Sequence, residues 1–131
     1  MAKYKYVTEF ELRAGVKMLF PYLSNPGEMQ EWLADQVNIS NDKVYEFVWE
    51  DDQRKAKIAT KRTNSHIKYI FIQDGEEDDD DPSYLEFKIN FNEMTQSSFL
   101  KVIDYSDMDD EEELEDLWVH LVGKLKETVG G

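Results

Sequence analysis

Hydrophobic and polar residues alternate along the first segment of the chain, between residues 4 and 13. Large or β-branched side chains take every second position, and charged side chains fill most of the positions between them. A period of two puts the two sets on opposite faces of an extended chain, so this segment is predicted to be a strand. The face with the large side chains consists of Tyr4, Tyr6, Thr8, Phe10 and Leu12.

The spacing of apolar residues becomes helical after Gly15. They recur three or four positions apart, which predicts two short helices separated by Asn25-Pro26-Gly27. Pro26 suits the first position of the second helix, because its missing N–H would have no partner there. The apolar residues are Val16, Leu19, Phe20 and Leu23 in the first helix, and Met29, Trp32 and Leu33 in the second.

Strand and turn patterns fill the chain from Val37 to Tyr105. The connections between these runs are too short for helical crossovers, so the strands should pair in antiparallel fashion. One run also carries Lys55, Lys57 and Lys61 at a spacing of two, as expected for an exposed face. The predicted strands lie near residues 37–40, 44–50, 55–62, 66–73, 84–92 and 96–105.

The chain closes with a predicted amphipathic helix over residues 107–129. Acidic residues crowd its first turns and lysines its last turns, which complements the helix dipole at both ends. Its apolar stripe is Leu114, Leu117, Trp118, Leu121 and Leu125. The order of elements predicts an α+β fold, in which a curved antiparallel sheet of six to seven strands wraps around this helix.

Composition limits the classes of function. The 131 residues are expected to form a single domain, 1–131, and a net charge of −14 disfavours nucleic acid and anionic membrane surfaces as partners. Because the chain has no cysteine, disulfides and thiolate chemistry are excluded. Neither an apolar leader nor a run of about 20 apolar residues is present, so we expect no membrane insertion and a cytoplasmic location.

Four core-forming stretches stand out between residues 3 and 128. They are Asn25-Pro26…Met29…Trp32-Leu33-Ala34-Asp35, Tyr45-Glu46-Phe47-Val48-Trp49, Tyr84-Leu85-Glu86-Phe87 and Leu117-Trp118…Leu121…Leu125. These stretches resemble those of START-like (SRPBCC) domains. That helix-grip superfamily also includes Bet v 1-type proteins, polyketide cyclases and the activator domain of a heat-shock chaperone ATPase. The nearest likeness is to small acidic bacterial START-like proteins without an assigned role. Asn41-Asp42-Lys43 departs from the glycines that many relatives carry there.

The resemblance implies a hydrophobic or lipid-like ligand in a cavity between the sheet and the C-terminal helix. The residues themselves predict no cofactor and no metal site, since the acidic run lacks the ligand spacing of a calcium-binding loop and the two histidines lie on separate elements. Ordinary core packing explains the same aromatic residues equally simply, so both interpretations stay open. The residues expected to line such a cavity are Phe20, Trp32, Trp49, Phe71, Phe87, Trp118 and Leu121.

Two other functions remain open on the sequence. An acidic loop at 74–83 and the acidic start of the last helix would suit a co-chaperone-like module that binds a basic protein. Arg62 and Tyr69 are the candidates for a cyclase- or hydrolase-like enzyme, but no catalytic motif surrounds them or the two histidines, His66 and His120. The sequence therefore favours a binding domain over an enzyme, without excluding the latter.

Overall fold

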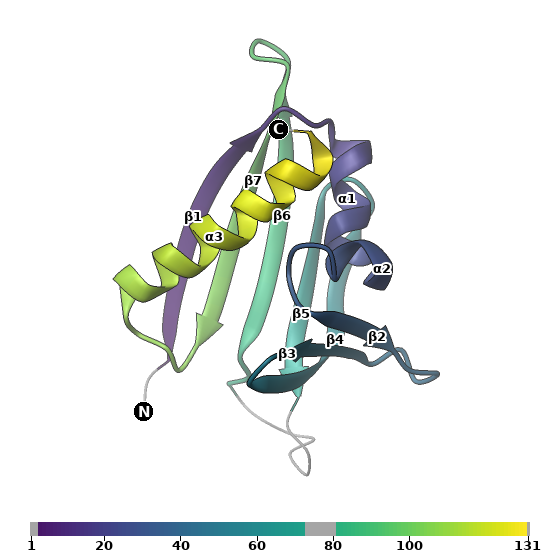
Figure 1. Cartoon of the computed structure of the whole chain (residues 1–131), viewed down its shortest axis with the longest axis vertical. Helices are drawn as coiled ribbons and strands as arrows, with labels where there is room; N and C mark the ends of the chain where they lie inside the picture. The colour runs from purple at the N-terminus through teal and green to yellow at the C-terminus, as the bar shows by residue number, and fades with distance from the viewer. Residues whose placement is uncertain (1–2, 73–80, 131) are drawn as a thin grey trace.

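The computed structural model describes residues 3–72 and 81–130. Within these ranges the chain forms one seven-stranded sheet, with three helices on one of its faces (Figure 1). The strands are β1 (Tyr4–Leu12), β2 (Gln36–Ile39), β3 (Tyr45–Trp49), β4 (Asp52–Arg62), β5 (His66–Ile72), β6 (Tyr84–Asn92) and β7 (Ser97–Ser106). The helices are α1 (Val16–Ser24), α2 (Pro26–Met29) and α3 (Glu111–Val129).

The sheet has the strand order β1-β7-β6-β5-β4-β3-β2, and every neighbouring pair is antiparallel. The α+β helix-grip architecture expected from the sequence is thus confirmed. The pairing register aligns the apolar faces of adjacent strands, as in the opposed residues Phe87 and Val102, both of which are fully buried. One continuous apolar face therefore runs across the sheet beneath the helices.

The long helix begins four residues later than the sequence pattern predicts. Asp110 precedes it in an extended conformation and accepts a 3.1 Å hydrogen bond from the Glu113 amide, so Asp110 is the N-cap. The helix therefore begins after the capping residue Asp110 and not at Asp107, the first acidic residue of the run. At the other end Gly130 adopts the left-handed conformation, with φ of 87°, that commonly terminates helices.

The two short helices differ from the sequence expectation in their length and regularity. Pro21 is accommodated inside α1, whereas α2 is only four residues long. Trp32, expected on the second helix, lies just beyond α2 in a turn and is buried. Its indole Nε1 donates a 2.7 Å hydrogen bond to the Tyr22 carbonyl, which ties this turn to α1.

Two buried tyrosines attach α1 to the sheet. The Tyr69 hydroxyl donates to the Leu23 carbonyl at 2.6 Å, and the Tyr45 hydroxyl donates to the Ser24 carbonyl at 3.0 Å. Both acceptors belong to the last turn of α1, where carbonyls lack partners within the helix. The sheet therefore satisfies the end of α1 and fixes its position over β3 and β5.

Part of the predicted acidic loop lies outside the described residues. Of residues 74–83, only Asp81, Pro82 and Ser83 fall within them. No described helix is long and apolar enough to cross a lipid bilayer.

Candidate functional site

Aromatic rings join α3 to the sheet through the centre of the covered face. The ring centroids of Trp32 and Phe87 are 5.7 Å apart, and those of Phe87 and Trp118 are 6.1 Å apart. All three side chains are at most 3% exposed. Phe87 on β6 is thus enclosed between the turn after α2 and the long helix, and the expected contact of the sheet with Trp118 is confirmed.

A second aromatic cluster lies on the covered face of β3 and β5. The centroid of the Phe47 ring lies 5.9 Å from that of Trp49 and 6.3 Å from that of Phe71. Phe47 is buried, but Trp49 and Phe71 are only partly buried. The aromatic surface therefore continues from the closed core toward solvent at this end of the sheet.

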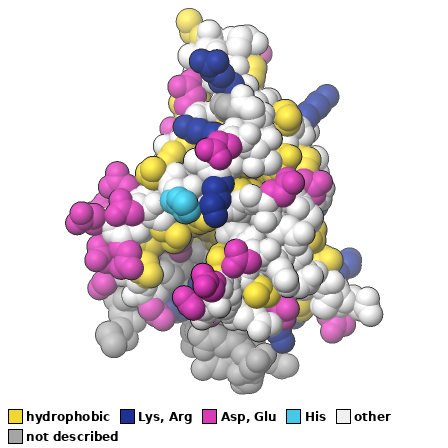
Figure 2. All heavy atoms as spheres, in the orientation of Figure 1, with side chains coloured by type: hydrophobic (Ala, Val, Ile, Leu, Met, Phe, Trp, Pro, Cys, Tyr) yellow, Lys and Arg dark blue, Asp and Glu magenta, His cyan; other side chains and the backbone are white. Residues whose placement is uncertain are grey.

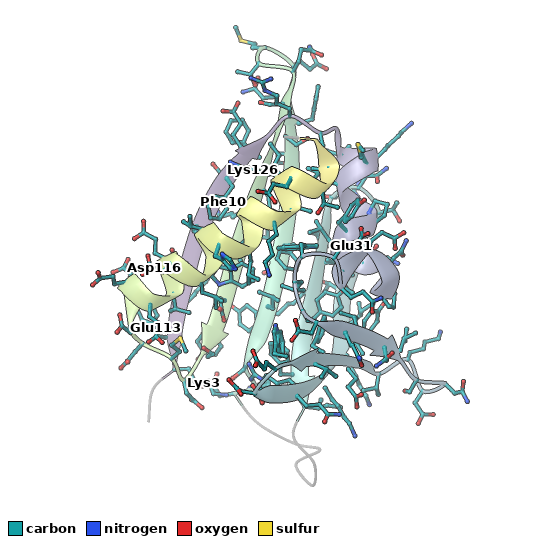
Figure 3. All side chains as sticks on the ribbon, in the orientation of Figure 1. Lys3, Phe10, Glu31, Glu113, Asp116 and Lys126 are labelled. Atoms are coloured by element: carbon teal, nitrogen blue, oxygen red, sulfur yellow. The ribbon has the colours of Figure 1, made fainter. Side chains whose placement is uncertain are left out.

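A hollow of about 100 Å³ opens where α3 meets the turn after α2 and the end of β3. Its apolar wall includes Trp32, Trp49 and Leu121, which come from three separate parts of the chain. The complete lining is Gln30, Glu31, Trp32, Leu33, Ala34, Asp35, Trp49, Leu121 and Lys124. Beside these apolar side chains, the charged residues Glu31, Asp35 and Lys124 form a rim. Figure 3 labels Glu31 of this rim.

Each tryptophan ring is held by a hydrogen bond from its Nε1. Trp49 donates to the Leu33 carbonyl at 2.9 Å, and Trp118 donates to the Asp104 carboxylate at 3.0 Å. Together with the bond from Trp32 described above, these contacts fix all three indoles. Of the three, Trp32 and Trp49 line the hollow, and only Trp49 among them is partly exposed.

The seven residues predicted to line a cavity do not all share this hollow. Trp32, Trp49 and Leu121 line it, whereas Phe71, Phe87 and Trp118 belong to the aromatic clusters beside it. Phe20 is buried in α1 and is not part of the hollow's lining.

Two charged residues on the covered face were not singled out from the sequence. Arg54 on β4 lies opposite Phe47, with its guanidinium carbon 4.0 Å from the centroid of the Phe71 ring. Asp104 on β7 is partly buried beside Trp118. Burial raises the pKa of Asp104, while the Trp118 hydrogen bond and the positive charge of Arg54 act in the opposite direction.

The residues proposed for catalysis are placed differently. Arg62 is exposed at the end of β4, whereas Tyr69 is fully buried and its hydroxyl is already committed to the Leu23 carbonyl. Burial raises the pKa of Tyr69, so this phenol stays protonated at neutral pH. Neither side chain lines the hollow between the sheet and α3.

A second, larger hollow of about 430 Å³ lies at the end of the sheet formed by β2 to β5. Glu46, Lys55 and Ile72, three of its lining residues, are register neighbours whose side chains point away from the helices. Its lining contains no aromatic residue. The smaller hollow is the stronger candidate site, because the buried aromatic clusters adjoin it.

The start of α3 presents a different surface. Figure 2 shows Asp and Glu side chains gathered at this end of the molecule, and Figure 3 labels Glu113 and Asp116 there. Every residue from Asp107 to Glu113 is exposed. Leu117, which was expected in the apolar stripe, is 42% exposed, as is Met108. We call residues 107–117 the acidic face.

A family model described as a START-like superfamily domain matches residues 1–131. The chain belongs to the START-like superfamily. This confirms the resemblance to START-like domains that the core stretches of the sequence indicated. A search of curated proteins gave no match.

Solved structures extend the comparison. A Bacteroides fragilis protein determined by solution NMR shares 33% identity, with a TM-score of 0.63, over 98% of this chain and 92% of its own. The Aha1 dimer from Colwellia psychrerythraea is 10% identical, with a TM-score of 0.76, over 96% of both chains. DynU16, from the dynemicin biosynthetic locus, is 12% identical, with a TM-score of 0.71, over 94% of this chain and 46% of its own. The last two likenesses concern the fold alone, which does not determine function.

Proposed function

We propose that this START-like domain binds a small hydrophobic ligand at the seam between its sheet and α3. One observation carries the proposal: Trp32, Trp49 and Leu121 come from distant parts of the sequence and line the same hollow. Ligand binding is common among helix-grip proteins, which supports the same interpretation.

The size of the hollow restricts the ligand. Its volume of about 100 Å³ is well below the roughly 300–1,000 Å³ of sites for drug-sized molecules. A short alkyl chain or one end of a longer molecule therefore enters it, while the remainder lies along Trp49 and Phe71 at the partly exposed end of the sheet. Burial of apolar surface provides the affinity, at roughly 25 cal/mol per Å² before the costs of association.

Octanol is a suitable neutral probe for this site, and its binding can be measured by calorimetry. The Leu121→Phe substitution adds volume to the wall of the hollow and is expected to weaken octanol binding at least about tenfold, or roughly 1.4 kcal/mol. Leu117→Phe is the matched control, because Leu117 lies one turn away on the same helix but is exposed. This control should bind octanol as the unmodified protein does.

Two results would count against the proposal. One is the absence of octanol binding to the unmodified protein up to the solubility limit of the alcohol. The other is equal binding by the Leu121→Phe and Leu117→Phe variants, because the ligand would then lie elsewhere.

The acidic face supports a second candidate function, the binding of a basic protein. Its exposed carboxylates surround the exposed apolar side chains of Met108 and Leu117. Charge directs the approach of a cationic partner, and apolar contact adds affinity once the surfaces meet. This arrangement favours a co-chaperone-like or other protein-interaction role.

Chemical-shift mapping with a lysine-rich peptide tests this second function. The expected shifts are centred on residues 107–117 and disappear at high salt, because screening weakens exposed charge pairs. A variant with Leu117→Ser should bind more weakly at unchanged net charge. Shifts spread evenly over the other acidic side chains would show nonspecific attraction only and would refute a docking role.

A further inference from the structure

Arg54 stands out as a cation on the apolar, covered face of the sheet. In the register of β3 and β4, Arg54 is opposite Phe47. Ala56, two residues later on the same face, is opposite Tyr45 and fully buried. The guanidinium carbon lies 4.0 Å from the centroid of the Phe71 ring. Arg54 is partly buried, so its charged group is at the edge of the core and still open to solvent.

The hydrogen-bonding capacity of Arg54 is unused within the described part of the chain. A guanidinium has five N–H donors. No hydrogen bond or ion pair joins those of Arg54 to residues 3–72 or 81–130, and its contact with the Phe71 ring uses none of them. An arginine placed against apolar surface with free donors is suited to bind an anion, since guanidinium and carboxylate groups form paired hydrogen bonds.

Asp104 does not occupy this position. Its carboxylate accepts the Trp118 indole hydrogen bond, and within the described residues it forms no direct ion pair with Arg54. Two strands, β5 and β6, separate the strands that carry the two charges. Arg54 therefore attracts Asp104 only from a distance, and neither Asp104 nor another described residue takes up its donors.

The aromatic surface connects Arg54 to the hollow. Trp49 lines the hollow and stacks on Phe47 with centroids 5.9 Å apart, and Phe47 is the direct cross-strand neighbour of Arg54. Phe47 itself is buried, but Trp49 and Phe71, which both contact it, are partly exposed. An apolar chain that starts in the hollow can thus follow these two rings and reach the guanidinium over Phe71. This path places an anionic group at one end and an apolar pocket at the other.

We infer that the ligand is an amphiphile with a carboxylate, which Arg54 binds while the apolar tail enters the hollow. This inference rests on the proposed function and specifies the chemical class of the ligand. Asp104 acts against the bound carboxylate through its like charge. Neutralising Asp104 should therefore strengthen the binding of a carboxylate, whereas neutralising Arg54 should weaken it.

Octanoate and octanol are a matched pair of probes, because they share the alkyl chain and differ in the charged group. Arg54→Gln is expected to weaken octanoate binding at least about tenfold, the size of a lost charge-assisted hydrogen bond. The affinity of this variant for octanol should stay within about twofold of that of the unmodified protein, which also shows that the variant is folded. Arg62→Gln is the control, since Arg62 is an exposed arginine of the same strand.

Two further variants sharpen the test. Arg54→Lys keeps the charge but loses the paired geometry, so its affinity for octanoate should lie between those of the unmodified protein and Arg54→Gln. Asp104→Asn retains an acceptor for Trp118 and should raise the affinity for octanoate without changing that for octanol.

The outcomes separate the two proposals. If octanol binds and Arg54→Gln affects octanoate no more than octanol, the carboxylate class is wrong and the hydrophobic site remains. If both probes fail to bind the unmodified protein, both proposals are wrong.

Discussion

The two faces of the sheet are made by the same strands, yet they differ in almost every physical respect. On the covered face, Phe87 and Val102 are opposed and fully buried. On the open face, the residues next to them in sequence, Lys88 and Lys101, are also opposed. Lys88 is exposed and Lys101 is partly buried. A period of two assigns neighbouring residues to opposite environments, so a single strand serves both.

The open face also carries an unfavourable pattern of charge. Lys88 and Lys101 are opposed in the register of β6 and β7, with Glu9 of β1 opposite Lys101 on its other side. Like charges in direct opposition destabilise a sheet slightly. The stability of this domain thus resides on the covered face, and the open face tolerates small electrostatic costs.

The largest effect is expected from Phe87→Ala on the covered face. Removing this enclosed ring leaves a cavity between Trp32 and Trp118, which should lower the free energy of unfolding by about 3–5 kcal/mol. Phe91→Ala is the control on the same strand, because Phe91 is 43% exposed, and it should lower that free energy by no more than about 1.5 kcal/mol. Urea denaturation measures both, and equal losses would contradict the contrast between buried and exposed positions.

Tyr69→Phe should have the next largest effect. It removes the hydroxyl that binds the Leu23 carbonyl and leaves that acceptor without its partner, at a cost of roughly 1–3 kcal/mol in the free energy of unfolding. Tyr105→Phe, which removes an exposed hydroxyl bonded to Asp81, should change little. Chemical denaturation of the two variants would refute the anchoring role of Tyr69 if their midpoints coincided.

Asp104→Asn should raise stability at neutral pH. Burial raises the pKa of Asp104 in the folded state, so its favourable contribution is complete below the ordinary carboxyl pKa of about 3.9 and is lost as pH rises through the raised value. The Asn variant avoids this loss and keeps an acceptor for Trp118. Thermal unfolding over a pH series should show a difference in stability between the variant and the unmodified protein that grows from acid to neutral pH. A difference that stays constant or shrinks would contradict this prediction.

The smallest effect concerns the open face. Lys88→Gln relieves the opposition to Lys101 and should stabilise the domain by about 0.2 kcal/mol at low salt. The gain should disappear at high salt, where exposed charges are screened. Denaturation midpoints at two ionic strengths measure it, and a loss of stability would contradict the proposed repulsion.

The elements could largely be read from periodicity, because the core depends on which side chains alternate or recur at helical spacing. The 84–92 strand is predicted to the residue, since Leu85, Phe87 and Ile89 alternate without interruption. Local irregularity limits the rest. A register shift between Ile58 and Thr60 places Lys61 opposite Ile67, so Lys61 does not share the face of Lys55 and Lys57 as a strict period of two predicts.

The candidate site was harder to predict because it depends on contacts between distant segments. Four strands, β4 to β7, lie between Trp49 and Leu121 in the sequence, and the two residues come together only in the fold. Arg54 and Asp104 did leave a signal in the sequence, since each is a charge on the apolar face of an alternating strand. That signal can be interpreted only once the register shows which face is covered.

The three tryptophan indole signals in a nitrogen–proton correlation spectrum provide the most direct test of the covered-face site. During titration with octanol, the signals of Trp32 and Trp49 should shift with one common dissociation constant, because both residues line the hollow. Backbone signals of Ile39 and Ile72, at the larger hollow, should stay unchanged. Shifts confined to Ile39 and Ile72, with both indole signals unmoved, would contradict the covered-face site.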